Sequence, residues 1–295
     1  MRARTRLTAL AAGLTLALGA PAATAATADQ AQTATTADQA QPAASASVEH
    51  GPAPTKESIG VDGPYKVASK KAPIDLKRSF YGGTIYYPAD AGKGETYGTV
   101  VTMPGFLEPG AVMDLVAKRL ASHGFVVMRA EALTPFSIPL VRAQAVLSAQ
   151  KVLHADADLA PIMDTERTAL VGHSMGGGGV LHAAAMSEQD AVIPIHPWAQ
   201  TIFPLVKEPT LTIGGLLDNV APMVEYTLPI YASIGSETKG LFTDLAGTHW
   251  AGLVDNKVIQ GRILSFVKLH VDGDTRYEQF VCAPAEKGFT YKSPC

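Results

Sequence analysis

The sequence predicts an α/β fold in which a mostly parallel central sheet carries helices on both faces. Short apolar, β-branched runs alternate along the chain with amphipathic helical patterns. In addition, residues 172–176 read Gly-His-Ser-Met-Gly between an expected strand and an expected helix, which is typical of a nucleophile elbow. Parallel strands need crossover connections, and the intervening helices supply them. About 235 residues follow a low-complexity N-terminal region, enough for one domain with a large core.

The first half of this domain begins with a run of alternating aromatic and small residues that ends at Pro88 and predicts an early strand. A β-branched run closed by Pro104-Gly105 predicts a buried strand. The elements expected here are strands at 79–87, 98–103 and 125–128, and helices at 112–122 and 139–153.

The second half continues the alternation on either side of Ser174. The elements expected here are strands at 167–171, 191–195, 210–213 and 240–245, and helices at 180–186 and 255–270, with Asp255 as the N-cap of the last helix. Because catalytic groups in such sheets gather in the loops beyond the carboxyl ends of the strands, those loops are where the other reactive residues are expected.

The N-terminal region has two parts. Residues 1–25 carry three arginines, an apolar run and an Ala-Thr-Ala site, which predicts a cleaved secretory signal peptide and hence a secreted protein without membrane insertion. Residues 26–58 are rich in Ala, Thr and Gln and contain Thr-Ala-Asp-Gln-Ala-Gln twice, which predicts a disordered spacer. The catalytic domain is therefore expected at 59–295, as a monomer.

Charge and cysteine content narrow the class of protein further. The net charge of −3 becomes about −6 once the leader is removed, so nothing suggests nucleic-acid binding. Cys282 and Cys295 are the only cysteines, and an oxidising compartment favours a disulfide between them over two free thiols. Neither lies near a histidine pattern typical of zinc.

Ser174 needs an imidazole that takes its proton, and the imidazole needs a carboxylate that fixes its tautomer. Two histidines, His249 and His270, follow Ser174 at sufficient distance. His270 ends a predicted helix, where it would interact with the helix dipole, whereas His249 lies in a small-residue loop after a strand and is the expected base. The other histidines in this half are expected to pack or hydrogen-bond structurally: His173, His182 and His196.

Several aspartates could serve as the acid. Asp218 follows the expected strand 210–213 through a short loop, at the correct end of the sheet. Asp190 precedes a strand, Asp244 is expected within one, and Asp255 caps a helix. Asp218 is therefore the predicted acid.

A tetrahedral oxyanion needs two hydrogen-bond donors. The amide of Met175, directly after the nucleophile, is the first, and the amide of Phe106, in the loop after strand 98–103, is the second. Trp198 lies in a loop on the same edge, so Phe106 and Trp198 could flank a substrate ring or acyl chain, although aromatics near loops often only pack.

From Gly63 to Cys295 the chain resembles the bacterial cutinases and poly(ethylene terephthalate) hydrolases of the α/β-hydrolase superfamily. The resemblance rests on Gly82-Gly83-Thr84-Ile85-Tyr86-Tyr87-Pro88, Leu120-Ala121-Ser122-His123-Gly124-Phe125-Val126-Val127, the run Gly172–Gly179, Pro197-Trp198, and Asp274-Thr275-Arg276-Tyr277 followed by the paired cysteines. It implies the same roles for Ser174, Asp218, His249, Phe106, Met175 and Trp198, and the same disulfide. No long apolar lid insertion is evident, so no lid domain is expected.

The chain departs from this family near the expected cleft. Phe106 stands where a tyrosine is usual, residues 131–139 lack the expected Asn/Thr/Asp character, and Trp250 is bulkier than the usual neighbour of the base. Leu216 and Leu245 occupy two positions that bind calcium in some relatives. No metal and no cofactor are therefore expected.

These observations predict a secreted serine esterase that cleaves cutin-like or synthetic polyesters and short to medium acyl esters. A lipase or carboxylesterase without polyester activity is the alternative. A binding protein that has lost catalysis is a third reading, which the intact set Ser174, Asp218 and His249 argues against.

Overall fold

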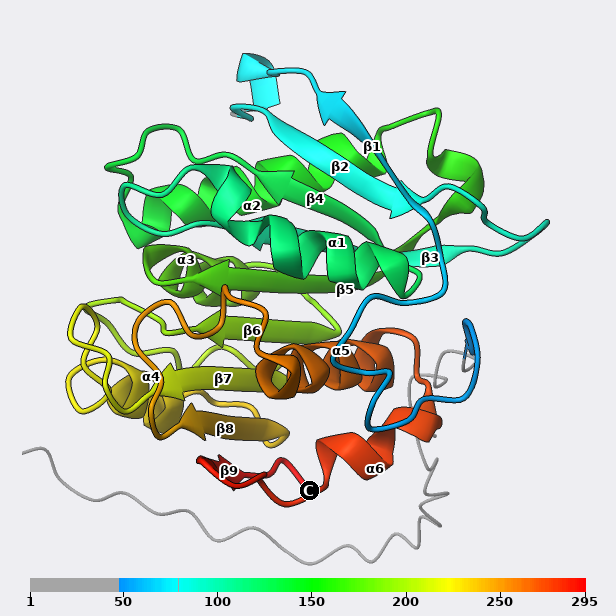
Figure 1. Ribbon diagram of the computed structural model, residues 1–295. Helices are drawn as coiled ribbons and strands as arrows, with labels where there is room; N and C mark the ends of the chain where they lie inside the picture. The colour runs from blue at the N-terminus through cyan, green and yellow to red at the C-terminus, as the bar shows by residue number, and fades with distance from the viewer. Residues whose placement is uncertain (1–47, 79) are drawn as a thin grey trace, which may run out of the picture. The chain divides into compact units, whose positions relative to one another are not determined.

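The computed structural model describes residues 48–78 and 80–295 (Figure 1). Within these residues, nine strands form one sheet in the order β1-β2-β4-β3-β5-β6-β7-β8-β9. The six strands from β4 to β8 in this order pair in parallel, whereas β1, β2 and β9 pair antiparallel at the two edges. The strands are β1 Val67–Ala72, β2 Gly83–Pro88, β3 Tyr97–Met103, β4 Val126–Ala130, β5 Met163–His173, β6 Ala191–Ile195, β7 Thr210–Gly215, β8 Lys239–Asp244 and β9 Phe289–Lys292.

Helices cover both faces of this sheet, as the sequence predicts. They are α1 Asp114–Ser122, α2 Pro139–His154, α3 Met175–Ala184, α4 Thr227–Ser233, α5 Lys257–Val271 and α6 Glu278–Val281, with 3₁₀ turns at Leu76–Arg78, Gly110–Met113, Ala160–Ile162 and Thr275–Tyr277. Figure 1 shows α1 and α5 crossing in front of the sheet. The arrangement is that of an α/β-hydrolase.

The core has one layer on each face of the sheet. The side chains of β3 are all buried and alternate between the layers, so that Val101 and Met103 pack with α2 and α3 while Val100 packs with α1 and α5. Strands buried on both faces read as continuous apolar runs, which is why the sequence indicates them clearly. Because the central strands are parallel, the loops after β3, β5, β6, β7 and β8 meet at one edge.

The N-terminal segment differs from the prediction of a spacer that reaches residue 58. Residues 48–58 are part of the described structure: the Val48 amide donates to the Asp272 carbonyl (2.8 Å), and the buried His50 donates from Nε2 to the Thr96 carbonyl (3.0 Å). The predicted signal peptide, at 1–25, and residues 26–47 lie outside the described residues. Within the described chain, no helix is both long and apolar enough to cross a lipid bilayer.

Two local features of the helices also differ from expectation. Asn256, and not Asp255, caps α5, because its side chain accepts from the amides of Val258 and Ile259, while Asp255 pairs with Arg119. Helix α3 begins at Met175, five residues earlier than the sequence suggests, and includes four consecutive glycines at 176–179.

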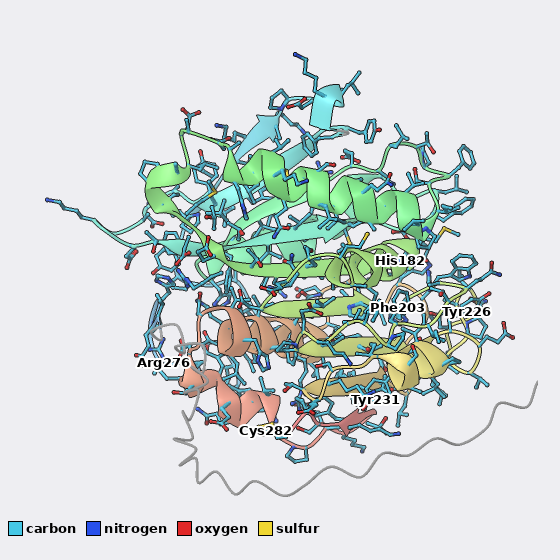
Figure 2. The ribbon with its side chains drawn as sticks, turned by 180° about the vertical axis from the view of Figure 1, so that it is seen from behind. His182, Phe203, Tyr226, Tyr231, Arg276 and Cys282 are labelled. Carbon is cyan, nitrogen blue, oxygen red and sulfur yellow. A yellow bond between two sulfur atoms is a disulfide. The ribbon has the colours of Figure 1, made fainter. Side chains whose placement is uncertain are left out.

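The predicted disulfide is present between Cys282 and Cys295. Figure 2 shows Cys282 where α6 ends, and the bridge ties this point to the residues that follow β9. The bridge therefore links the edge strand β9 covalently to the end of α6.

Candidate active site

Ser174 occupies a sharp turn between β5 and α3. Its backbone has φ 54° and ψ −120°, a strained region for a residue with a side chain. A Cβ on Gly172 would lie 2.2 Å from the carbonyl oxygen of Gly176, and one on Gly176 would lie 2.3 Å from that of Met103. Only glycine fits at either position, so these two glycines permit the turn that presents Ser174 at the carboxyl end of β5.

Asp218 and His249 come together from the loops after β7 and β8. His249 Nδ1 donates to Asp218 Oδ2 at 2.8 Å, and both side chains are buried. This bond places the proton on Nδ1, so the opposite nitrogen, Nε2, is left to accept one. The arrangement is the one in which an imidazole acts as a general base.

The Asp218 carboxylate accepts four hydrogen bonds. Its Oδ1 accepts from the amides of Val220 (2.9 Å) and Ala221 (2.8 Å), and its Oδ2 accepts from His249 and also from His196 Nδ1 (3.1 Å). Burial alone would raise the pKa of Asp218, but the bonds from His196, His249 and the Ala221 amide outweigh it and hold this pKa well below its usual range. The acid is therefore ionised.

His196, which the sequence predicts to pack or hydrogen-bond structurally, hydrogen-bonds to the carboxylate of Asp218. The residue follows β6 directly and has a positive φ of 44°. Burial lowers its pKa despite the carboxylate, so the ring is neutral and donates from Nδ1. Its buried Nε2 has no hydrogen-bond partner among the described residues.

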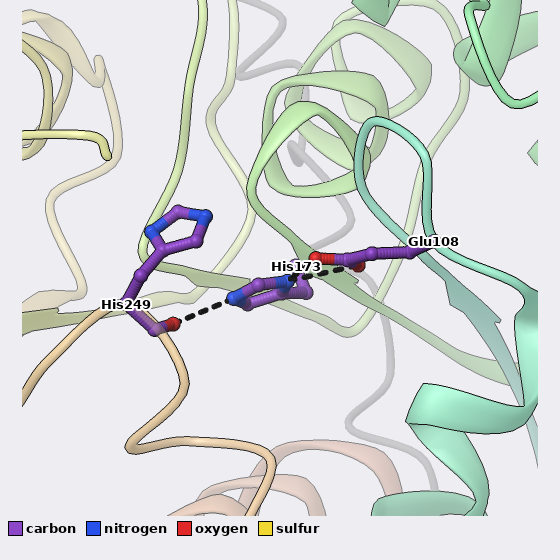
Figure 3. A group of neighbouring side chains, drawn as sticks. All are labelled: Glu108, His173 and His249. Carbon is purple, nitrogen blue, oxygen red and sulfur yellow. Dashed lines mark hydrogen bonds and ion pairs between the residues drawn. The ribbon is translucent and has the colours of Figure 1, made fainter.

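Ser174 and His249 are linked through His173, the residue before the serine. His173 Nε2 donates to the main-chain carbonyl of His249 (2.8 Å), and the two rings lie 4.7 Å apart (Figure 3). No hydrogen bond joins the Ser174 hydroxyl to the His249 ring. In ligand-free sites this contact is often long and tightens when substrate binds. The three predicted residues thus lie in one cluster at the same edge of the sheet.

The loop that carries Phe106 runs directly against Ser174. A Cβ on Gly105 would lie 2.7 Å from the Cβ of Ser174. The Phe106 amide makes no hydrogen bond to another described residue. Met175 is the first residue of α3, and the first N–H groups of a helix have no acceptor within it. Both amides are thus free to donate to a developing oxyanion.

Aromatic and aliphatic side chains surround this edge of the sheet. The Trp198 amide donates to the Ser174 carbonyl (2.9 Å), and the Trp198 ring stacks on Tyr226, which Figure 2 labels (centroids 5.5 Å apart). Loops after four different strands expose large apolar side chains, among them Phe106, Leu107, Phe136, Ile138, Leu216, Leu217, Val220, Leu245 and Trp250. Isolated exposed apolar residues are ordinary, but a gathering around one site indicates contact with an apolar ligand.

Two groups of side chains bring potential metal ligands within 4.8 Å of one another: Glu108, His173 and His249, and His196, Asp218 and His249. Glu108 already pairs with His173, and the rings of His196 and His249 both donate to Asp218. A metal ion would have to displace the protons that these pairs share. We assign no metal to either group.

The sequence does not single out Glu108, and it does not predict that His196 contacts Asp218. Glu108 is a carboxylate within a short turn only two residues after Phe106, and its burial indicates a specific partner. His196 follows the last residue of an expected strand, the same position rule that identified Asp218. The sequence thus shows where both side chains lie along the chain, but not which residues they contact.

The fold and this cluster together define an α/β-hydrolase that acts on carboxylic esters. The profile of the PET hydrolase-like family matches residues 42–294. The chain belongs to this family. It is 37% identical to a bis(hydroxyethyl) terephthalate hydrolase of Streptomyces coelicolor, over 84% of this chain and 82% of the relative. It is 36% identical to cutinase 2 of Thermobifida cellulosilytica, over 84% and 97%, and 36% identical to a cutinase of Thermobifida fusca, over 84% and 85%.

Proposed function

We propose that the protein is a secreted, monomeric hydrolase that cleaves the ester bonds of polyesters and of small aromatic or short to medium acyl esters. The observation that carries the proposal is the hydrogen bond from His249 Nδ1 to Asp218 beside the strained turn at Ser174. The exposed apolar loops around Ser174 support a water-insoluble substrate. The names of the relatives, cutinases and a bis(hydroxyethyl) terephthalate hydrolase, agree with this substrate class.

In the proposed mechanism, the Ser174 hydroxyl gives its proton to His249 Nε2 as its oxygen attacks the ester carbonyl. The amides of Phe106 and Met175 stabilise the resulting oxyanion. The proton then passes from His249 to the departing alcohol oxygen, which leaves an acyl-enzyme on Ser174. His249 next deprotonates a water that attacks this acyl group, and the acid leaves as the proton returns to Ser174. The aromatic rings of Phe106 and Trp198 would flank the substrate.

One feature favours a narrower substrate range. Trp250 lies next to the proposed base, with 47% of the residue exposed and its ring centroid 5.5 Å from that of His249. A bulky ring there can exclude a polymer chain from the active site while still admitting small soluble esters. Such an enzyme would be the carboxylesterase of the alternative reading.

The test compares product release from an amorphous aromatic polyester film with turnover of soluble p-nitrophenyl esters. Replacing Ser174 by Ala should reduce both rates by at least about 10³-fold, because the nucleophile is lost. Ser187→Ala, three residues beyond the end of α3, is the matched control and should leave both rates unchanged. Soluble-ester turnover without film hydrolysis would support the carboxylesterase instead. Activity that survives Ser174→Ala would refute the mechanism.

A further inference from the structure

Glu108 is a buried carboxylate beside the proposed catalytic residues, and the mechanism above gives it no role. It lies in the turn after β3, and its side chain is 5% exposed. One of its oxygens, Oε2, accepts a hydrogen bond from the amide of Gly105. Since Phe106 follows Gly105 directly, this bond fixes the loop that carries one proposed oxyanion donor.

The same carboxylate also contacts His173. Its two oxygens lie 2.8 Å and 3.0 Å from His173 Nδ1, and the opposite nitrogen of the ring donates to the main-chain carbonyl of His249 (Figure 3). One hydrogen-bonded chain therefore runs from the Phe106 loop, through the residue before Ser174, to the main chain of the proposed base.

Proton positions in this chain follow from the chemistry of its members. A carbonyl oxygen only accepts, so His173 Nε2 must carry a hydrogen. A carboxylate next to a bare Nδ1 would place two lone pairs against each other. Glu108 and His173 together therefore hold one further proton between Oε and Nδ1. Around this pair lie the neutral His196, the His249 and Trp250 rings, and the buried cation of Arg142, which binds the Pro104 carbonyl.

We propose that Glu108 is a positioning residue for ester hydrolysis: through Gly105 it sets the Phe106 amide, and through His173 it sets the main chain of His249. This inference rests on the proposed function. Glu108 does not touch substrate, so its loss should weaken interactions made in the transition state and leave ground-state binding unchanged. That pattern appears as a lower kcat with an unchanged KM.

Two substitutions of similar size separate hydrogen bonding from packing. In Glu108→Gln, the amide oxygen can accept from Gly105 and the amide nitrogen can donate to the bare Nδ1 of a neutral His173, whose Nε2 still donates to His249. In Glu108→Leu, both links are lost. The matched control is Glu286→Leu, which removes a partly buried acid that pairs with Arg262 of α5 and not with any proposed catalytic residue.

The experiment measures kcat and KM on a soluble p-nitrophenyl ester at neutral pH, with the melting temperature of each variant. Glu108→Leu should lower kcat by about 10- to 100-fold, since small misplacements of reacting groups cost this much, with KM within about twofold. Glu108→Gln should keep kcat within about threefold of the parent, and Glu286→Leu should do the same.

Two results would overturn the proposal: a folded Glu108→Leu variant with the parent's kcat, or a Glu108→Gln variant as slow as Glu108→Leu. If Glu108→Leu does not fold, Glu108→Asp replaces it, since a side chain shorter by one methylene cannot reach both Gly105 and His173. An unchanged kcat in the Glu108→Asp variant also overturns the proposal. Ser174→Ala, measured in parallel, reports separately on the proposed function. Hydrolysis that survives Ser174→Ala would refute the proposed function, whatever the Glu108 variants do.

Discussion

Removing the disulfide between Cys282 and Cys295 should destabilise the protein by a predictable amount. The bridge closes a loop with a sequence separation of 13. Cross-linking a loop of this length takes about 3 kcal/mol of chain entropy from the unfolded state. For a domain of this size, each kcal/mol corresponds to about 2–4 °C, so the double Cys→Ser variant should melt about 6–12 °C lower.

Other contacts hold the same segment and limit the loss. Strand β9 pairs with β8 over four residues, Phe289 stacks on Phe242, and the Arg262 guanidinium lies 4.6 Å from the centroid of the Tyr291 ring. These contacts persist without the bridge. Activity at 25 °C should therefore change less than about twofold, because the variant remains folded there.

The assay is thermal unfolding, followed by calorimetry and by circular dichroism, of the parent and of the double variant with and without reductant. Reductant should lower the melting temperature of the parent to that of the variant and leave the variant unchanged. A shift below about 2 °C would refute the loop-entropy argument, because it would mean that the unfolded chain gains little freedom when the bridge is absent.

Three further outcomes are expected. Asp218→Asn should lower kcat by about 10³- to 10⁴-fold, because His249 loses the acceptor that fixes its tautomer. Burst kinetics on a p-nitrophenyl ester will measure this loss, and a loss below tenfold would contradict the assignment of Asp218 as the acid. His196→Phe removes one hydrogen-bond donor from Asp218, so the carboxylate charge acts more fully on His249. The acidic midpoint of the kcat/KM profile should therefore move to higher pH. A shift of this midpoint to lower pH would count against this reasoning. Burial lowers the pKa of His270 from 6.5 to about 4, so the contribution of its neutral form to stability is complete above about pH 6.5 and is lost as the pH falls towards 4. In urea titrations at several pH values, His270→Phe should flatten this decline in stability. An unchanged slope would show that His270 does not cause the decline.

The central strands and the Asp218–His249 pair could be predicted because both follow from short-range patterns. Apolar β-branched runs indicate buried strands, and the position of a residue after such a run places it at the active edge. The edge strands β1 and β9 escaped prediction because, apart from the buried Ala72, their side chains alternate between exposed and partly buried positions. Helix α4 escaped because it contains Pro229, which normally argues against a helix.

The contacts of Glu108 and His196 could not be predicted because they depend on loop conformation. His196 reaches Asp218 from a backbone with positive φ, which local propensity disfavours for histidine. Glu108 meets His173 across 65 residues of sequence, and no local pattern encodes that pairing. Such contacts form only when the sheet brings separate loops together.

The glycine run at the start of α3 bears on the order in which the domain folds. Each glycine lowers helix stability by about 1 kcal/mol relative to alanine, so the four together leave this segment with little tendency to form a helix alone. A Cβ on Gly178 would lie 2.4 Å from the Trp198 carbonyl oxygen, so the helix packs closely against the loop that follows β6 and depends on it for stability. The segment that presents Ser174 is therefore expected to acquire its structure late, after β3, β5 and β6 have paired, with φ-values near zero in a kinetic analysis of folding.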